Sequence, residues 1–271
     1  MKSTLPKLVA FDLDGTLAES KQLLGKDMGD LLGKLLEKLP IAVMSGGSYP
    51  QFQKQFLASI PSDARLERLY LFPTNASELY QYVEGAWHAS YDLELSPEEK
   101  EAIRNALTHA LASTEVERDI TTTWGEQIED RGSEISFSAL GQQAPISEKE
   151  KWDPERRKRT SLQEALQPLL PDFTIRIGGM TTIDIVRKGI TKAYGIQKLA
   201  QITAIPIREM LYVGDALYPG GNDEVVKETE IPTFQVSSVA ETALKIKSIL
   251  EALSTHESVT TQKRPHLKEA L

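Results

Sequence analysis

A short apolar run near the start of the chain ends in two aspartates and a glycine, and it constrains the fold more than any other segment. Residues 9–17 read Val-Ala-Phe-Asp-Leu-Asp-Gly-Thr-Leu. A continuous apolar run bounded by a turn is typical of a buried parallel strand, and Gly15 marks its predicted end. Open α/β sheets bind ligands at the carboxyl ends of such strands. Asp12 and Asp14 are therefore candidate site residues.

The spacing of Asp12 and Asp14 suits phosphoryl transfer. Two nearby carboxylates repel each other at neutral pH, so we expect a cation or a raised pKa between them. In such a site one aspartate attacks phosphorus, the other moves the proton, and Mg²⁺ screens the charge. An isolated Asp-Gly would be more typical of a solvated turn after a strand. The pattern Asp-x-Asp-Gly-Thr directly after a strand favours the enzyme site.

Strand and helix patterns alternate at both ends of the chain, around a middle segment of different character. Apolar strand-like runs occur at 7–12, 40–44, 69–72, 210–214 and 232–236, with helical patterns at 27–39, 48–59, 191–202, 221–228 and 239–253. This alternation predicts an α/β fold, a doubly wound parallel, Rossmann-like sheet. The middle reads as a hairpin, a helix capped by Ser96, two strand-like runs and a basic helix, which together predict an inserted α+β cap.

These patterns predict three parts of the chain. Residues 1–80 and 187–253 are expected to form the catalytic core, and residues 81–186 the cap. Residues 254–271 are expected to be a C-terminal tail to which we assign no chemistry.

Composition narrows the range of functions. The 271 residues include no cysteine, which excludes disulfides, thiolate catalysis and zinc–thiolate sites. A net charge of −8 argues against nucleic acid as the main partner. No stretch is apolar enough to span a membrane, and the first residues lack the apolar region of a signal peptide. We therefore expect a cytoplasmic enzyme whose partner is a small phosphorylated molecule.

Two further segments carry residues suited to holding a phosphate. Ser45 and Gly46 follow a predicted strand and precede a helix, where a hydroxyl and free backbone N–H groups can cradle an anion. Ser48 is equally well interpreted as the N-cap of that helix. Lys192 falls in the first turn of a predicted helix, where a cation opposes the helix dipole. That placement makes sense if its ammonium reaches the phosphate and Asp12; Lys188 is the alternative.

A third segment, Gly-Asp-Ala-Leu-Tyr-Pro-Gly-Gly-Asn-Asp at 214–223, follows another buried strand. Asp215 offers a hard oxygen ligand for Mg²⁺ opposite Asp12. Asp223 is either a helix cap, a holder of a metal-bound water, or a residue that orients Lys192.

The motif at 12–16 and the run at 214–223 resemble the haloacid dehalogenase superfamily, subclass IIB, and within it the eukaryotic-type phosphomannomutase branch. The likeness covers about residues 7–250 and includes Phe-Pro-Thr-Asn at 72–75 and Gly-Gly-Met-Thr-Thr-Ile-Asp at 178–184. The resemblance implies that Asp12 is the nucleophile and that Asp14 is the general acid/base and lends a backbone carbonyl to Mg²⁺. It implies further that Ser45 and Lys192 hold the phosphate and that Asp215 binds Mg²⁺.

The chain departs from that branch at positions expected to meet the substrate. Lys21 stands where the mutases carry an arginine, and Arg131 matches the first of several cap arginines that grip a distal phosphate. Gln142 stands where a further arginine is typical, and an amide cannot give the charge-assisted bidentate grip of a guanidinium. Thr182 and Asp184 lie in the segment at 178–184, which resembles a cap strand of that branch. We expect both residues near the sugar.

Three functions stay open on the sequence. The first is a Mg²⁺-dependent phosphatase acting on a small sugar or polyol phosphate. The second is a phosphomannomutase that interconverts mannose 6-phosphate and mannose 1-phosphate, and the third is a non-catalytic binder of sugar phosphates. The charged residues expected in the core are all present, so we rank the non-catalytic binder last. The cap arginine that Gln142 replaces is absent, which favours hydrolysis over isomerisation of the sugar phosphate. We also expect a homodimer formed through the cap.

Overall fold

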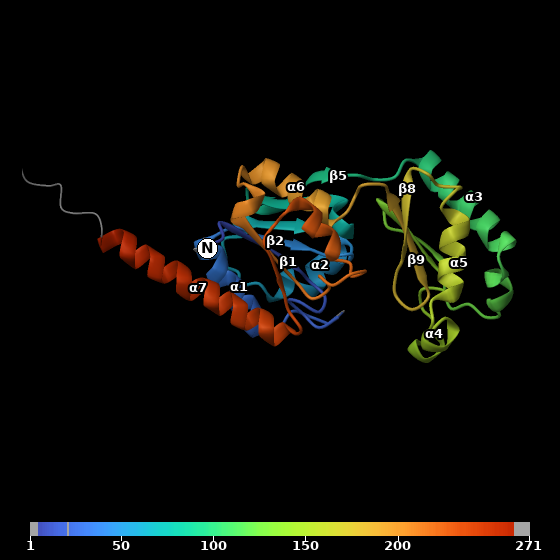
Figure 1. Cartoon of the computed structure of the whole chain (residues 1–271), viewed down its shortest axis with the longest axis horizontal. Helices are drawn as coiled ribbons and strands as arrows, with labels where there is room; N and C mark the ends of the chain where they lie inside the picture. Colours follow the sequence, from blue (N-terminus) through green and yellow to red (C-terminus); the bar gives the residue numbers. More distant parts are fainter. Residues whose placement is uncertain (1–4, 21, 263–271) are drawn as a thin grey trace, which may run out of the picture. The chain divides into compact units, whose positions relative to one another are not determined.

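The structure, a computed structural model, describes residues 5–20 and 22–262, with side-chain surroundings up to His256. The chain forms two compact units, residues 1–90 with 191–271, and residues 91–190 (Figure 1). We refer to them as the core and the cap. Lys21 and residues 263–271 lie outside the described residues.

The core is built on a seven-stranded sheet in the order β11-β10-β1-β2-β3-β4-β5. The five strands from β11 to β3 are parallel, and β4 runs antiparallel to β3. In chain order the strands are β1 (Leu8–Asp12), β2 (Ile41–Met44), β3 (Leu69–Phe72), β4 (Glu78–Val83), β5 (Ala86–Asp92), β10 (Met210–Gly214) and β11 (Thr233–Gln235). The predicted doubly wound parallel sheet is confirmed.

Helices cover both faces of this sheet (Figure 1). They are α1 (Lys26–Lys38), α2 (Tyr49–Gln55), α6 (Lys192–Thr203) and α7 (Val239–Gln262). Val9 and Phe11 of β1 share one hydrophobic core with α1, α2 and α7. Since alternate strand residues point to opposite faces, Ala10 and Asp12 face the other side, where α6 packs against β2. The sheet thus presents Asp12 toward the helix that carries Lys192.

The cap is a four-stranded antiparallel sheet in the order β6-β7-β9-β8. Its strands are β6 (Ile128–Asp130), β7 (Glu134–Ser138), β8 (Phe173–Ile177) and β9 (Thr182–Arg187), and its helices are α3 (Pro97–Ser113), α4 (Ile146–Trp152) and α5 (Arg157–Leu166). Ser96 caps α3 with a reciprocal bond to Glu99, as its sequence indicates. One face of the sheet packs on α3 and α5 through a core that includes Ile135, Phe137 and Ile185.

The structure differs from the sequence-based boundaries in three places. The hairpin β4–β5, placed by sequence in the cap, joins the core sheet, where Tyr80 stacks on Tyr49 with ring centroids 3.6 Å apart. The division between units consequently follows Ser90 rather than residue 80. The predicted helix at 221–228 is a 3₁₀ segment, Glu224–Thr229, and α7 continues into the expected tail as far as Gln262.

Candidate active site

Four residues singled out by sequence meet at the carboxyl edge of the core sheet. Asp12 ends β1, Ser45 follows β2, and Asp215 follows β10, which flanks β1 on the other side. Lys192 begins α6 behind the N-cap Thr191, whose hydroxyl accepts the backbone N–H of Tyr194. Because neighbouring parallel strands end at one edge, residues distant in sequence become neighbours here.

Lys192 is buried and bridges two carboxylates. Its ammonium donates to Asp12 and, at 2.6 Å, to Oδ1 of Asp223. Burial alone would lower the pKa of Lys192, but Asp12 and Asp223 outweigh it and hold that pKa above its ordinary value. Gly195 lets α6 come close to the 3₁₀ segment Thr74–Ala76 that follows β3, since a Cβ there would lie 2.7 Å from that of Ala76. The lysine therefore stays charged where a phosphoryl group needs a cation.

Asp223 is fully buried, and both of its oxygens have partners. Oδ1 accepts from Lys192 and from the hydroxyl of Tyr212 at 2.6 Å, and Oδ2 accepts from the backbone N–H of Ala216 at 3.2 Å. Of the roles that the sequence left open for Asp223, these contacts favour orientation of Lys192.

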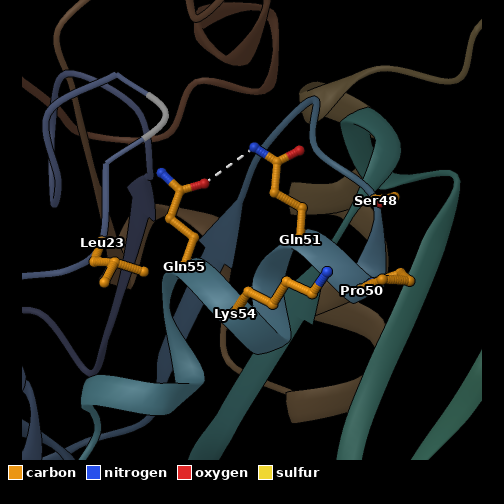
Figure 2. A pocket seen from close by; sticks show the side chains of 6 residues that line it. All are labelled: Leu23, Ser48, Pro50, Gln51, Lys54 and Gln55. Atoms are coloured by element: carbon orange, nitrogen blue, oxygen red, sulfur yellow. Dashed lines mark hydrogen bonds between the residues drawn. The ribbon is translucent and has the colours of Figure 1, made fainter.

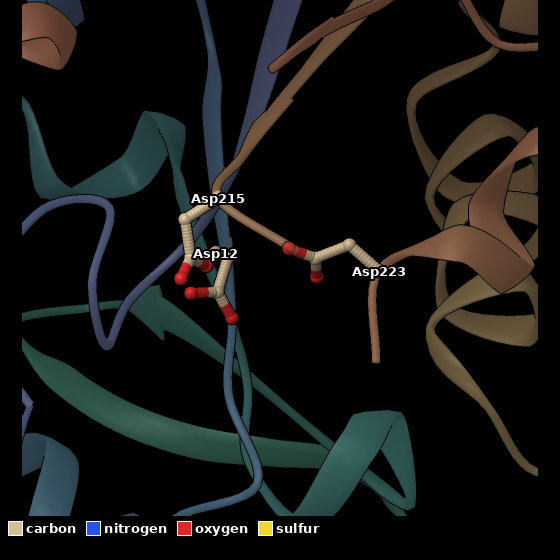
Figure 3. A group of neighbouring side chains, drawn as sticks. All are labelled: Asp12, Asp215 and Asp223. Atoms are coloured by element: carbon tan, nitrogen blue, oxygen red, sulfur yellow. The ribbon is translucent and has the colours of Figure 1, made fainter. Parts of the chain in front are cut away.

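The carboxylates of Asp12, Asp215 and Asp223 form a group whose nearest oxygens all lie within 4.8 Å of one another (Figure 3). Oδ2 of Asp12 is buried and has no hydrogen-bond partner among the described residues. Asp215, half-buried, receives a 3.4 Å bond from the hydroxyl of Thr16. A partnerless buried oxygen beside a second carboxylate fits a hard divalent cation such as Mg²⁺. Bound there, the ion would neutralise charge on the carboxylates and on a phosphate.

The electrostatics at Asp12 also fit a site for a cation. Burial, together with the charges of Asp223 and Asp215 and against the opposing charge of Lys192, raises the pKa of Asp12 to about 7. Burial and the charge of Asp223 also raise the pKa of Asp215. One lysine does not offset three carboxylates, so an added positive charge would favour the ionised, nucleophilic form of Asp12.

Asp14 contacts a residue that the sequence analysis missed. The side-chain amide of Gln55 donates to Oδ1 of Asp14 at 2.9 Å, and the hydroxyl of Ser45 lies 3.5 Å from Oδ2. Gln51 in turn donates to Gln55 at 3.0 Å, one helical turn away on α2. A glutamine inside a helix carries no motif, so only its four-residue spacing from Gln51 hinted at a pair.

A shallow pocket opens beside this contact, lined by Leu23, Ser48, Pro50, Gln51, Lys54 and Gln55 (Figure 2). Ser45 is buried, and its hydroxyl accepts the backbone N–H of Gly47 at 3.0 Å, while Gly46 is exposed. Ser48 precedes α2 without making a side-chain cap bond. The Ser-Gly-Gly turn therefore keeps a hydroxyl and backbone groups close to Asp14.

The candidate substrate residues Arg131, Gln142, Thr182 and Asp184 all belong to the cap. Thr182 and Asp184 lie on β9, in register with Ser138 and Ser136 of β7. Arg131 follows β6, and Gln142 follows the turn after β7, where its side-chain amide nitrogen is buried without a partner in the described part of the chain. Since the cap is a separate unit, their role toward a substrate stays a prediction.

The model of a known family, described as eukaryotic phosphomannomutase, matches residues 28–252 of the chain. The chain belongs to the eukaryotic phosphomannomutase family. A phosphomannomutase of Schizosaccharomyces pombe is 26% identical over 89% of this chain and 93% of its own length. One from Spinacia oleracea is 28% identical over 83% of this chain and 88% of its own length.

Solved structures with the same fold include phosphatases. An IMP-nucleotidase of Plasmodium falciparum has a TM-score of 0.66 at 17% identity, covering 92% of this chain and 69% of that one. A trehalose-6-phosphate phosphatase of Aspergillus fumigatus has a TM-score of 0.55 at 14% identity, covering 90% of this chain and 92% of that one. These matches confirm the haloacid dehalogenase fold, and the phosphomannomutase family places the chain among enzymes that transfer phosphoryl groups.

No described helix is both long and apolar enough to cross a bilayer.

Proposed function

We propose that this chain is a Mg²⁺-dependent phosphatase that hydrolyses a small sugar phosphate through a phosphoryl group carried on Asp12. The observation that carries the proposal is the buried contact of Lys192 with Asp12, beside the partnerless Oδ2 of Asp12. A nucleophilic oxygen, a fixed cation and a carboxylate pair for a metal then lie within one site of the core.

The residues of this site supply each step of the transfer. A carboxylate oxygen of Asp12 attacks phosphorus, the P–O bond to the sugar breaks, and Asp14 gives its proton to the departing sugar oxygen. Lys192 and the Ser45–Gly46 turn balance the charge on the phosphoryl oxygens. Asp14 then takes a proton from water, whose oxygen bonds to phosphorus and releases Asp12 and inorganic phosphate.

The alternative acceptor is a sugar hydroxyl, which would make the chain a phosphomannomutase. The names of the matched relatives support this alternative better than they support hydrolysis. One feature of the cap favours hydrolysis instead. A mutase must hold a sugar bisphosphate while it reorients, yet Arg131 is already bound by Glu129 and Glu134, and Gln142 is uncharged. Neither residue offers a free guanidinium to a second phosphate.

Phosphorus NMR of one reaction separates the two functions. Mannose 6-phosphate is supplied with Mg²⁺ and a trace of hexose 1,6-bisphosphate as primer. We expect inorganic phosphate to appear without a build-up of mannose 1-phosphate. Faster interconversion of the two mannose phosphates than release of phosphate would establish the mutase. A cytoplasmic location and a homodimer through the cap remain predictions from the sequence.

A further inference from the structure

A tyrosine lies in the interior of the core, on the strand that leads to Asp215. Tyr212 occupies β10, in register with Ala10 of β1, and its side chain is fully buried. Because alternate strand residues point to opposite faces, its ring lies on the same side of the sheet as Asp12, whereas Val213 packs in the hydrophobic core on the other side. A phenylalanine would fill the same space, so the hydroxyl needs an explanation of its own.

The hydroxyl of Tyr212 donates a 2.6 Å hydrogen bond to Oδ1 of Asp223. The same oxygen accepts from the ammonium of Lys192 at 2.6 Å. Gly214 makes this approach possible, since a Cβ there would collide with Oδ2 of Asp223 and lie 2.9 Å from Cε1 of Tyr212. One buried carboxylate oxygen therefore serves two donors, one of them charged and the other neutral.

Lys192 has three N–H groups to distribute. One donates to Asp12 and one to Asp223, and the part of the chain that the structure describes supplies no third acceptor. In the proposed reaction the third N–H is available to a phosphoryl oxygen. The strength of that contact depends on Asp223, since an ammonium drawn fully to one carboxylate balances less charge elsewhere.

A second donor on Oδ1 reduces the negative charge that Asp223 presents to its surroundings. Two consequences for a phosphoryl group have the same sign. Asp223 holds Lys192 less strongly, and an incoming dianion meets less repulsion from a carboxylate that water does not screen. With phenylalanine at position 212, Oδ1 would keep Lys192 alone, and both advantages would be lost.

We propose that Tyr212 is a positioning residue for phosphoryl transfer, whose hydroxyl shares Oδ1 of Asp223 with Lys192 and so leaves the ammonium free to serve Asp12 and the phosphoryl group. The inference rests on the proposed function, in which Lys192 balances charge on the phosphoryl oxygens. It adds a neutral residue that acts through Asp223, and every group that it invokes belongs to the core.

Binding of tungstate, a tetrahedral oxyanion like phosphate, tests the inference without turnover. Its Kd in the presence of Mg²⁺ is measured by calorimetry for the unaltered chain, for Tyr212→Phe and for a control, Tyr70→Phe, which removes a partly buried hydroxyl from β3. We expect Tyr212→Phe to raise Kd about tenfold, the size of a lost hydrogen bond to a charged group. Tyr70→Phe should leave Kd unchanged.

A double-mutant cycle shows whether the hydroxyl acts through Asp223. In Asp223→Asn the shape of the side chain is kept but the charge to be shared is gone. Adding Tyr212→Phe in that background should therefore change Kd by less than about twofold. A tenfold change in both backgrounds would overturn the inference, and so would tungstate binding that Tyr212→Phe leaves unaltered.

If Asp223→Asn does not fold, or if tungstate binds too weakly to measure, the ¹H–¹⁵N signal of the Lys192 ammonium decides instead. It should shift in Tyr212→Phe, because the bond from Lys192 to Asp223 becomes stronger, and should stay in place in Tyr70→Phe. An unchanged signal in Tyr212→Phe would overturn the inference.

Hydrolysis of p-nitrophenyl phosphate by the unaltered chain is measured in parallel. Failure to hydrolyse it would count against the proposed function, while tungstate binding and the ammonium signal would still decide the role of Tyr212.

Discussion

The side-chain amide of Gln55 donates a 2.9 Å hydrogen bond to Oδ1 of Asp14 and is itself held by Gln51. Gln55 is buried on α2. This arrangement ties the orientation of the proposed general acid/base to the neutral side chains of Gln51 and Gln55 on α2.

Replacing Gln55 with Leu should lower kcat about tenfold with a smaller change in KM, because Asp14 loses an orienting partner but remains in place. The measurement is steady-state release of phosphate from a sugar phosphate and from p-nitrophenyl phosphate. Gln53→Leu, at an exposed position of the same helix, is the matched control. Equal rates for the two variants would show that Gln55 only fills space.

The nucleophile is tested by Asp12→Asn, which keeps the shape of the side chain and removes its charge. We expect less than about one thousandth of the original rate, as for other single removals of a nucleophile. Circular dichroism should show an unchanged fold, since Asp223 still holds Lys192. Asp63→Asn, at an exposed position, controls for loss of a carboxylate. A variant that keeps a tenth of the activity would contradict the mechanism.

Removal of divalent cations with EDTA should abolish activity, and added Mg²⁺ should restore it, because Asp12 and Asp215 lie together at the sheet edge. Saturating Mg²⁺ should also raise the melting temperature, since binding to the folded state at a hundred times Kd adds about 2.7 kcal/mol. Asp215→Asn should need at least about tenfold more Mg²⁺ for half activity. Full activity in EDTA would exclude this role for the carboxylates.

Glu134 should make the stability of the cap depend on pH. Its pKa is raised from 4.5 to about 7, so between these values the folded chain binds more protons than the unfolded chain. Stability therefore falls as pH rises through this window and levels off above it. Glu134→Gln removes the effect, so the variant should gain about 1–3 kcal/mol relative to the unaltered chain between pH 4.5 and 8. Urea unfolding at several pH values gives the difference, and a difference that stays constant with pH would refute this prediction.

The residues that meet at the edge of the core sheet could be named from the sequence because each lies in a local motif. Asp12, Ser45 and Asp215 each end an apolar strand, and the parallel order of those strands brings their ends together. The placement of Lys192 followed from a charge that would be unfavourable in a first helical turn unless a partner offset it.

The features that the sequence analysis missed depend on contacts between distant segments. Gln55 lies 41 positions from Asp14 along the chain, and no local pattern marks it. The hairpin after β3 looked like the start of the cap, because nothing in its own residues shows that β4 pairs back onto β3. The pairing of Arg131 with Glu134 is instead a local contact, made by the tight turn between β6 and β7, which returns the chain within three residues.

The four residues at the core sheet edge, Asp12, Ser45, Lys192 and Asp215, come from one compact unit, and the candidate substrate residues Arg131, Gln142, Thr182 and Asp184 come from the other. Selection can therefore act on the two separately. Substitutions in the cap would alter which compounds are accepted while the machinery for cleaving a phosphate ester remained intact. A change of accepted compound through substitutions in the cap would therefore leave the four residues of the core edge in place.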